Sequence, residues 1–461
     1  MREGFIQAAY LAASALFVLS LKGLTSPATA RRGIFLAEIG MLLAIVGTIL
    51  NHEIVRYDLI ILGLVIGALI GAPMAIWMPM TAVPQRTAIS HMFGALAATL
   101  VGVSEYYRHA GQLPHYEMTA LGFEVMFGSL TVTGSFMAFA KLQELLRGAP
   151  ITYRFQNVSN IILFVVTLGL FGYLIVHPAD QRAFYAMIGL GALIGILIVL
   201  PIGGADMPVV ISLLNSYAGL ASAATGFVLQ NNVLIIAGSL DGASGFVLSI
   251  LMSRAMNRSF GNVLFGAFGS SETAAASLKA AQEKTVRSIS PEDAAIQLAY
   301  ASSVVIVPGY GMAVAQAQHQ VRELSDLIEK RGGRVKYAIH PVAGRMPGHM
   351  NVLLAEANVP YDQLYDMEAI NDEFQRTDVA LVIGANDVVN PAARSSPGSP
   401  IYGMPILNGD QAKSIIVMKR SMAPGFAGIE NELFYDPKTV MLFGHAKDSL
   451  QRLIGEVKTA A

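Results

Sequence analysis

Long apolar runs separated by short polar segments fill the first 260 residues, and a different pattern follows them. Nine runs of about 20 mainly apolar residues are long enough to cross a bilayer as helices. They lie near residues 4–22, 33–50, 57–78, 84–104, 119–140, 158–177, 183–202, 208–229 and 233–254. The first run loosely resembles a signal peptide, but it continues to Leu24 and more runs follow, so an uncleaved helix is predicted.

Beyond residue 290, short β-branched runs alternate with amphipathic helical patterns. Strands are expected near 304–308, 334–339, 378–384, 414–419 and 439–443. Helices are expected near 291–302, 312–331, 350–357, 366–376 and from about 446. Such alternation predicts a Rossmann-like α/β domain with a parallel sheet covered on both faces.

These patterns predict three parts: a polytopic α-helical membrane domain, 1–260, a linker rich in Gly, Ser and Ala, 261–289, and the α/β domain, 290–461. Charge agrees with this division, because residues 1–260 carry 24 charged side chains and residues 261–461 carry 39. A net charge of -1 argues against a nucleic-acid partner, and the absence of cysteine excludes disulfides, iron–sulfur clusters and thiol catalysis.

Basic residues are distributed unequally between the two sets of loops. Loops that follow odd-numbered spans carry Lys22, Arg31, Arg32, Arg86, Lys141, Arg147, Arg154, Arg254 and Arg258, whereas the others carry Arg56, Arg108 and Arg182. The positive-inside rule then predicts an outside N-terminus and a cytoplasmic C-terminal domain.

The segment 304–315 carries a glycine-rich turn between a buried strand and a helix. Gly309 suits the tight turn, and Gly311 would let the backbone approach a pyrophosphate. The helix that Ala313 opens would direct its first amides at the phosphates. The motif alone is weak evidence, but its strand–turn–helix context favours a dinucleotide site.

The second strand ends at His340 without the carboxylate that would bind the ribose of NAD, which leaves NADP open. Lys419, Arg420 and Ser421 directly follow the strand near 414–419, and two cations with a hydroxyl suit a 2′-phosphate. A solvated basic strand end is the alternative. Loops 340–350 and 384–391 follow the carboxyl ends of two further predicted strands. Each could bind a ligand or be a plain turn.

Polar side chains inside the predicted spans are candidates for a proton pathway. They are His91, Glu124, Ser135, Asn215 and Asp241, with Asp206 and Arg258 at span ends. Histidine suits proton transfer because its reference pKa lies near neutrality, although a lone buried histidine is more often a packing residue. For Asp206 and Arg258, helix capping and snorkelling are the alternatives.

Several motifs together resemble the β subunit of proton-translocating nicotinamide nucleotide transhydrogenases over nearly the whole chain. They are Gly203 to Pro208, Arg254 to Phe260, Pro308 to Gln316, His340 to Ala357, Gly384 to Ala392 and Lys419 to Ser421. The resemblance implies that the C-terminal domain binds NADP(H), that Lys419 to Ser421 hold the 2′-phosphate, and that His91 and Asn215 belong to the proton pathway. It gives Asp241 no role.

The nucleotide contacts that the resemblance implies lie in four segments. They are Gly309, Tyr310, Gly311, Met312, Ala313, Val314; Val342, Ala343, Gly344, Arg345, Pro347; Gly384, Ala385, Asn386, Asp387, Val388; and Lys419, Arg420, Ser421, Gly425, Phe426, Ala427. Phe426 stands where the family often has tyrosine, which keeps the packing and removes a hydroxyl hydrogen bond.

The implied reaction is direct hydride transfer between NADH and NADP⁺, with no catalytic acid, base or metal. Because the sequence offers one dinucleotide site, the NAD(H) site is expected on a partner α subunit, in a dimer of αβ protomers in a bacterial inner membrane. The alternative is a transporter or channel whose Rossmann-like domain senses nucleotide without chemistry.

Overall fold

A computed structural model of the chain describes residues 2–50, 56–79, 82–109, 113–143, 145–146, 151–203, 206–255, 259–265, 285–344, 348–397, 399, 401–425 and 427–459. The chain divides into two compact units. The helical unit comprises Met1–Gly203 and Val210–Ser249, and the sheet unit comprises Gly204–Val209 and Ile250–Ala461.

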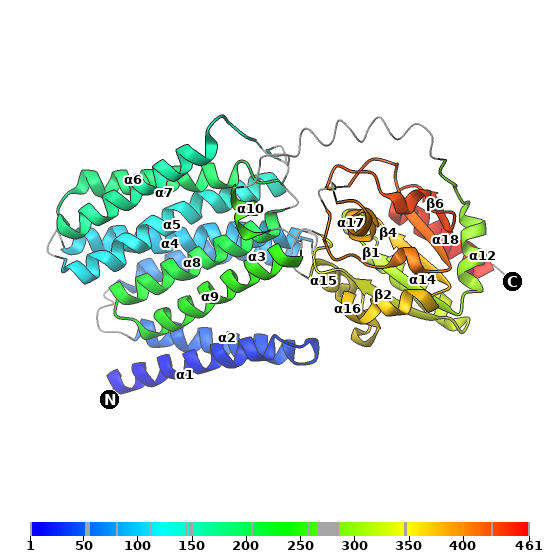
Figure 1. Cartoon of the computed structure of the whole chain (residues 1–461). Coiled ribbons are helices and arrows are strands. Elements are labelled where there is room, and N and C mark those ends of the chain that lie inside the picture. The colour runs from blue at the N-terminus through cyan, green and yellow to red at the C-terminus, as the bar shows by residue number, and fades with distance from the viewer. Residues whose placement is uncertain are drawn as a thin grey trace. The chain divides into compact units, whose positions relative to one another are not determined.

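Helices of 19 to 28 residues make up the helical unit (Figure 1). They are α1 (Arg2–Gly23), α2 (Pro27–Ile49), α3 (Tyr57–Trp77), α4 (Val83–His109), α5 (His115–Leu142), α6 (Gln156–Val176), α7 (Gln181–Val199), α8 (Met207–Val228) and α9 (Asn232–Ala255). Over the described residues, nine helices are long and apolar enough to cross a membrane. The chain is therefore a membrane protein, as the apolar runs predict.

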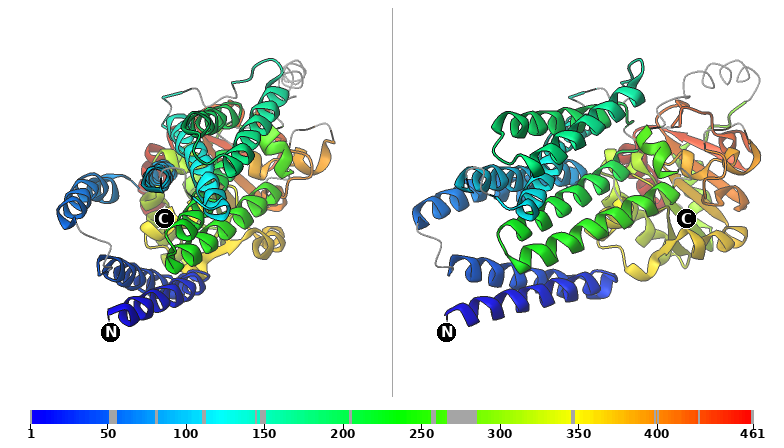
Figure 2. Two further views of the ribbon diagram at one scale, coloured as in Figure 1. Left: turned by 90° about the vertical axis from the view of Figure 1, so that its left-hand side faces the viewer. Right: turned by 60° about the vertical axis from the view of Figure 1, so that its left-hand side comes forward.

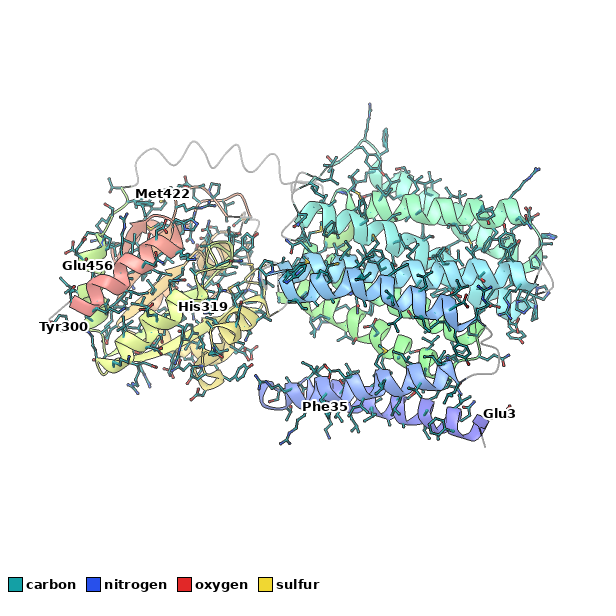
Figure 3. The ribbon with its side chains drawn as sticks, turned by 180° about the vertical axis from the view of Figure 1, so that it is seen from behind. Glu3, Phe35, Tyr300, His319, Met422 and Glu456 are labelled. Carbon is teal, nitrogen blue, oxygen red and sulfur yellow. The ribbon has the colours of Figure 1, made fainter. Side chains whose placement is uncertain are left out.

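Helix α5 is central to the packing of this unit, because it contacts α4, α6 and α7. Its core partners include Phe184 of α7, which also stacks on Tyr106 of α4 with ring centroids 3.9 Å apart. Helices α1 and α2 lie side by side in both views of Figure 2. Outward-facing apolar side chains are common, as Phe35 of α2 illustrates in Figure 3, which is expected of a surface in lipid.

The sheet unit contains a six-stranded parallel sheet in the order β3-β2-β1-β4-β5-β6. Its strands are β1 (Ser303–Pro308), β2 (Arg334–Ile339), β3 (Leu364–Asp366), β4 (Val379–Ile383), β5 (Ser414–Lys419) and β6 (Thr439–Phe443). Every residue of β4 is buried, as a central strand covered on both faces requires. This order is that of the doubly wound dinucleotide-binding fold, so the predicted fold class is confirmed.

Further helices precede, connect or follow the strands (Figure 1). They are α10 (Phe260–Phe265), α12 (Pro291–Ala299), α13 (Tyr310–Val314), α14 (Gln318–Lys330), α15 (His349–Glu356), α16 (Met367–Ile370), α17 (Ala392–Ser395) and α18 (Ala446–Thr459). Helix α12 begins as its sequence predicts, because the Ser290 hydroxyl accepts a hydrogen bond from the Asp293 amide at 3.2 Å.

Two predicted helices were wrong in detail, and one strand was missed. The helix expected over 312–331 is two helices, α13 and α14, because Gln316 adopts a left-handed conformation (φ 48°) between them. Ala313 therefore lies near the end of a short helix and does not open a long one. The helix expected over 366–376 becomes the 3₁₀ helix Asn371–Arg376 after Ile370, and edge strand β3 was not predicted. The boundaries at 260 and 289 stay predictions, and residues 266–284 between them lie outside the described residues.

Candidate functional site

The glycine turn after β1 meets the turn after β4 at the point where the strand order reverses. The amide of Gly309 donates to the Ile383 carbonyl at 2.9 Å, and the amide of Gly311 donates to the Gly384 carbonyl at 2.9 Å. In open parallel sheets, ligands bind outside the carboxyl ends of the strands at this reversal. The predicted glycine motif therefore lies where this fold binds nucleotides.

Glycine is required at this crossing by the approach of the two backbones. A Cβ atom at Gly309 would lie 2.4 Å from the Ala385 Cα, and one at Gly311 would lie 2.7 Å from the Gly384 Cα. Gly384 itself has a φ of 64°, which favours glycine. Packing within the chain thus accounts for all three glycines, and close approach of Gly311 to a pyrophosphate stays a prediction.

The rest of the short helix α13 splits between the core and the surface. Met312 and Ala313 are buried, Tyr310 is half-buried and Val314 is 53% exposed. Only Tyr310 and Val314 therefore direct side chains toward a ligand space or solvent in this segment.

The Asn386–Asp387 turn is fixed by residues about 40 positions further along the chain. Asn431 Nδ2 donates to the carbonyl of Asn386 at 3.0 Å and to its Oδ1 at 3.1 Å. The Ala427 amide donates to Asp387 Oδ2 at 3.0 Å, and a Cβ at Gly425 would lie 2.6 Å from Asp387 Oδ1. The structure thus brings the predicted segments 384–388 and 425–427 together.

One donor in this turn is left over. Asn386 Nδ2 is buried and has no hydrogen-bond partner among the described residues. Because a buried unsatisfied amide costs about 1–3 kcal/mol, such an atom is a candidate ligand donor.

Lys419 ends β5 next to the same turn. Its Nζ donates to the Ala423 carbonyl and lies 5.0 Å from the centre of the Phe434 ring. Burial lowers the pKa of Lys419, whereas the charge of Asp387 acts to raise it. Arg420 and Ser421 follow as exposed residues. Of the two cations at the end of β5, Lys419 is therefore partly buried and Arg420 faces solvent.

The loop after β2 is held by a buried histidine. His340 Nδ1 accepts from the Val342 amide at 3.3 Å, so Nε2 carries the proton and donates to the Pro405 carbonyl at 2.8 Å. Burial lowers the pKa of His340 to about 4, which keeps the ring neutral at physiological pH. Ala343 is buried and Gly344 packs on His349 with a φ of 112°. Arg345, Pro347 and Phe426 lie outside the described residues.

Predicted polar residues of the helical unit lie in three separate places. Glu124 on α5 is fully buried, and its Oε1 accepts from Thr225 Oγ1 of α8 at 2.8 Å. Asn215 Nδ2 on α8 donates to Asp241 Oδ1 on α9 at 3.0 Å. Each of these contacts joins a different pair of helices, and no hydrogen bond joins Glu124 to Asn215 within the described part of the chain.

His91 lines an open groove of about 560 Å³ between α3 and α4. Its Nδ1 is buried and, like Ser135 Oγ on α5 and Glu124 Oε2, has no hydrogen-bond partner among the described residues. Asp206 directly precedes α8, and Arg258 lies outside the described residues. Among the described residues, His91, Glu124, Ser135 and Asn215 thus lie in the helical unit, and no hydrogen bonds between their side chains join them into one chain.

Sequence reasoning missed residues whose partners are distant in the chain. Asn431 and Pro405 fix the turns of the candidate site, and no motif marks either. Lys141, at the end of α5, donates to the carbonyls of Val199 (3.2 Å), Leu200 and Ile202 (2.8 Å), at and just after the end of α7. A buried lysine near the end of an apolar run is the only signal that could have found it.

Comparison with known proteins agrees with this architecture. A family model described as NAD(P) transhydrogenase beta subunit matches residues 6–456. The protein named NAD(P) transhydrogenase subunit beta of Rhodospirillum rubrum is 48% identical over 461 residues, covering 98% of this chain and 99% of that protein. A second protein of that name, from a specified strain of the same organism, gives the same values. Since the matches span both units, the chain belongs to the family of NAD(P) transhydrogenase beta subunits.

Proposed function

We propose that this chain transfers hydride directly between NADP(H), bound by its sheet unit, and NAD(H), bound by a partner α subunit, and couples the transfer to proton translocation. The observation that carries the proposal is the meeting of two glycine turns, after β1 and β4, at the reversal of a doubly wound sheet. Membership in the transhydrogenase family supports the nicotinamide chemistry.

The residues at this edge fit a dinucleotide. Asn386 Nδ2 offers an unused buried donor, and Gly309, Gly311 and Gly384 keep bulky side chains away from the turn crossing. Residues of loops 342–347 and 425–427, which include Arg345 and Phe426, would close over the ligand. Neutral His340 would hold the first of these loops against the Pro405 carbonyl.

NADP(H) rather than NAD(H) is proposed for this chain because of charge. Strand β2 ends at Ile339 without a carboxylate to bind a ribose hydroxyl, whereas Arg420 and Ser421 are exposed at the end of β5. Arg420 would bind a 2′-phosphate through its guanidinium group, and Ser421 would add a hydroxyl hydrogen bond. Half-buried Lys419 would add positive charge to the same strand end.

Bound nicotinamide nucleotides supply the hydride chemistry themselves. The chain's own residues bind, orient and exclude water, so we propose no catalytic acid, base or metal. Because one dinucleotide site is proposed here, the second nucleotide requires an α subunit, and we propose that αβ protomers form a dimer.

Proton coupling gives the membrane unit its role. One charge crossing 100 mV contributes about 2.3 kcal/mol, which shifts an equilibrium about 50-fold. We propose that His91, Glu124, Ser135 and Asn215 carry the proton route, with Asp206 and Arg258 at its cytoplasmic end. Buried ionisable groups inside spans support this, because a bilayer tolerates them mainly where function requires them.

The proposed setting is a bacterial inner membrane, with the N-terminus outside and the sheet unit in the cytoplasm, where nicotinamide nucleotides are available.

The proposal is tested in proteoliposomes that contain this chain with or without its α partner. NADH-dependent reduction of an NADP analogue and proton uptake should both appear only with the partner. A nucleotide-regulated channel would instead pass ions without the partner and reduce nothing.

His91→Ala separates a proton relay from a packing residue. A relay should lose on the order of 100-fold in the proton-coupled forward rate while largely sparing the cyclic reaction, in which NADP(H) stays bound and no proton exchange is needed. Equal losses in both rates, after correction for folded protein, would show that His91 only packs.

A further inference from the structure

Helix α9 carries a carboxyl group in the middle of its apolar length. Asp241 is the tenth of its 24 residues and is exposed on the surface of this chain. A charged carboxylate at the centre of a bilayer costs about 3 kcal/mol or more when it faces lipid. Asp241 is therefore either neutral for part of its time or next to water or another chain.

Helices α8 and α9 pack closely beside Asp241, and this packing places Asn215 within hydrogen-bond distance of its carboxyl group. A Cβ at Gly219 would lie 2.4 Å from the Gly242 amide nitrogen, so the two helix backbones nearly touch there. Ser216 Oγ donates to the Gly242 carbonyl at 2.7 Å across the same contact. One residue before Gly242, Asp241 Oδ1 accepts from Asn215 Nδ2 at 3.0 Å.

Asn215 and Asp241 offer complementary chemistry. An amide can donate and accept hydrogen bonds but does not gain or lose a proton in the physiological range, whereas a carboxyl can. A titratable neighbour would give a route that passes Asn215 a group able to hold the proton, and Asp241 is a carboxyl to which Asn215 is hydrogen-bonded.

Other titratable or charged groups near Asp241 either contact other residues or lie far along their helices. On α8, Tyr217 packs against Phe127 of α5, with ring centroids 5.3 Å apart. On α9, Arg254 is 13 residues further along, about 20 Å at a rise of 1.5 Å per residue. Helix α1, which packs near the start of α9, carries Tyr10, bonded to Thr48, with Glu3 and Lys22 near its ends. Among these described neighbours, no cation fixes Asp241 in its ionised form.

We propose that Asp241 is a proton-carrying residue of the translocation route, taking up and releasing a proton beside Asn215. The Asp241 carboxylate binds one proton and later gives it up, and Asn215 Nδ2 orients the carboxyl through both states. This inference rests on the proposed proton coupling and adds a titratable group to it.

Asp241→Asn tests the inference in proteoliposomes that contain the full chain and its α partner. The substituted amide can still accept from Asn215 Nδ2, so the contact survives and only the titration is lost. Forward turnover and proton uptake should fall at least about tenfold, while the cyclic rate stays within about twofold of wild type. Asp58→Asn is the matched control, because it makes the same change at an exposed carboxylate that pairs with Arg56 at the start of α3.

Labelling with dicyclohexylcarbodiimide gives a readout independent of turnover. The protonated carboxyl adds across a C=N bond of the reagent, and the adduct rearranges to a stable N-acylurea with no leaving group. Mass spectrometry should find this adduct on Asp241 in the wild-type complex, with yield rising as the pH falls from 8 to about 5.

Two outcomes would overturn the role of Asp241 and leave the proposed function intact. One is full coupled activity, or equal loss of forward and cyclic rates, in Asp241→Asn. The other is no adduct at any of these pH values, as expected if a cation of another subunit keeps the carboxylate ionised. A wild-type complex without proton-coupled turnover would instead overturn the proposed function itself, before any variant is compared.

Discussion

Ionisable side chains have different partners in the two units. In the sheet unit, described acids and bases pair with opposite charges near the surface, as in Lys336–Glu373, Arg394–Asp410, Lys413–Asp378 and Lys458–Glu323. Inside the membrane-spanning helices, Glu124 meets a hydroxyl, Asp241 an amide and Lys141 backbone carbonyls. Opposite charges occur in the helical unit at helix ends, as in Arg56–Asp58.

This difference has consequences for both stability and function. A charge paired with an opposite charge in water contributes little, because solvent already stabilises both groups. A group held by neutral partners in a low-dielectric interior is not stabilised by solvent. Losing one of its partners therefore lowers the stability of the fold substantially. Such a group can also change its protonation state without breaking an ion pair, as proton transfer requires.

The largest expected effect is on the helical unit. Lys141→Met removes the cation from the carbonyls at and just after the end of α7, and several buried charge-assisted bonds are lost together, so unfolding should become easier by about 3 kcal/mol. Equilibrium unfolding in sodium dodecyl sulfate, followed by circular dichroism, measures this. Lys22→Met, in the exposed last turn of α1, is the control. If the two variants were equally stable, the neutral partners of Lys141 would contribute no more to stability than the surroundings of an exposed lysine.

His340 is the case in the sheet unit that resembles the membrane pattern, because its partners are neutral backbone groups. Its folded pKa of about 4 lies below the ordinary 6.5, so the unfolded state binds more protons between these values and stability falls as pH falls through that window. Between pH 7.5 and 5 the loss should be about 2 kcal/mol.

Hydrogen exchange of residues 337–344 in the full chain, corrected for intrinsic rates, checks this pH dependence. His340→Gln should flatten the profile, whereas His319→Gln, at an exposed position labelled in Figure 3, should not. A wild-type profile that is already flat would contradict the buried neutral ring.

Arg420→Ala tests a charge whose partner is expected to be a ligand. Loss of a charge-assisted bond should weaken NADP⁺ binding by about tenfold or more and leave NAD⁺ binding unchanged. Isothermal titration of the full chain with each nucleotide measures both. Arg452→Ala, an exposed arginine of α18, should change neither, and equal losses for both nucleotides would refute the 2′-phosphate assignment.

The smallest expected effect is at a surface ion pair. Lys458 and Glu323 are both about half exposed, with Nζ and Oε1 2.8 Å apart. A double-mutant cycle with Lys458→Met and Glu323→Gln should give a coupling of about 0.5 kcal/mol or less. A coupling as large as the effect at Lys141 would mean that exposed pairs also carry stability.

Periodicity and length predicted the long helices and most strands, because each of those elements buries enough apolar surface to leave a pattern in its own residues. They failed at Gln316, where one left-handed residue divides a helix, and at β3, where three residues form an edge strand. The glycine turns could be predicted from local sequence. Asn431 and Pro405 could not, because they act on residues 45 and 65 positions away.

The contact between Lys141 and the end of α7 also has a consequence for biosynthesis. Its first acceptor, the Val199 carbonyl, is 58 residues further along the chain. At a synthesis rate of about 5–20 residues per second, α5 is complete for about 3–12 s before that acceptor exists. During this interval the ammonium group must stay hydrated at the bilayer surface. Lys141 therefore gains its backbone partners only after α7 has been made, so this contact between α5 and α7 forms late in synthesis.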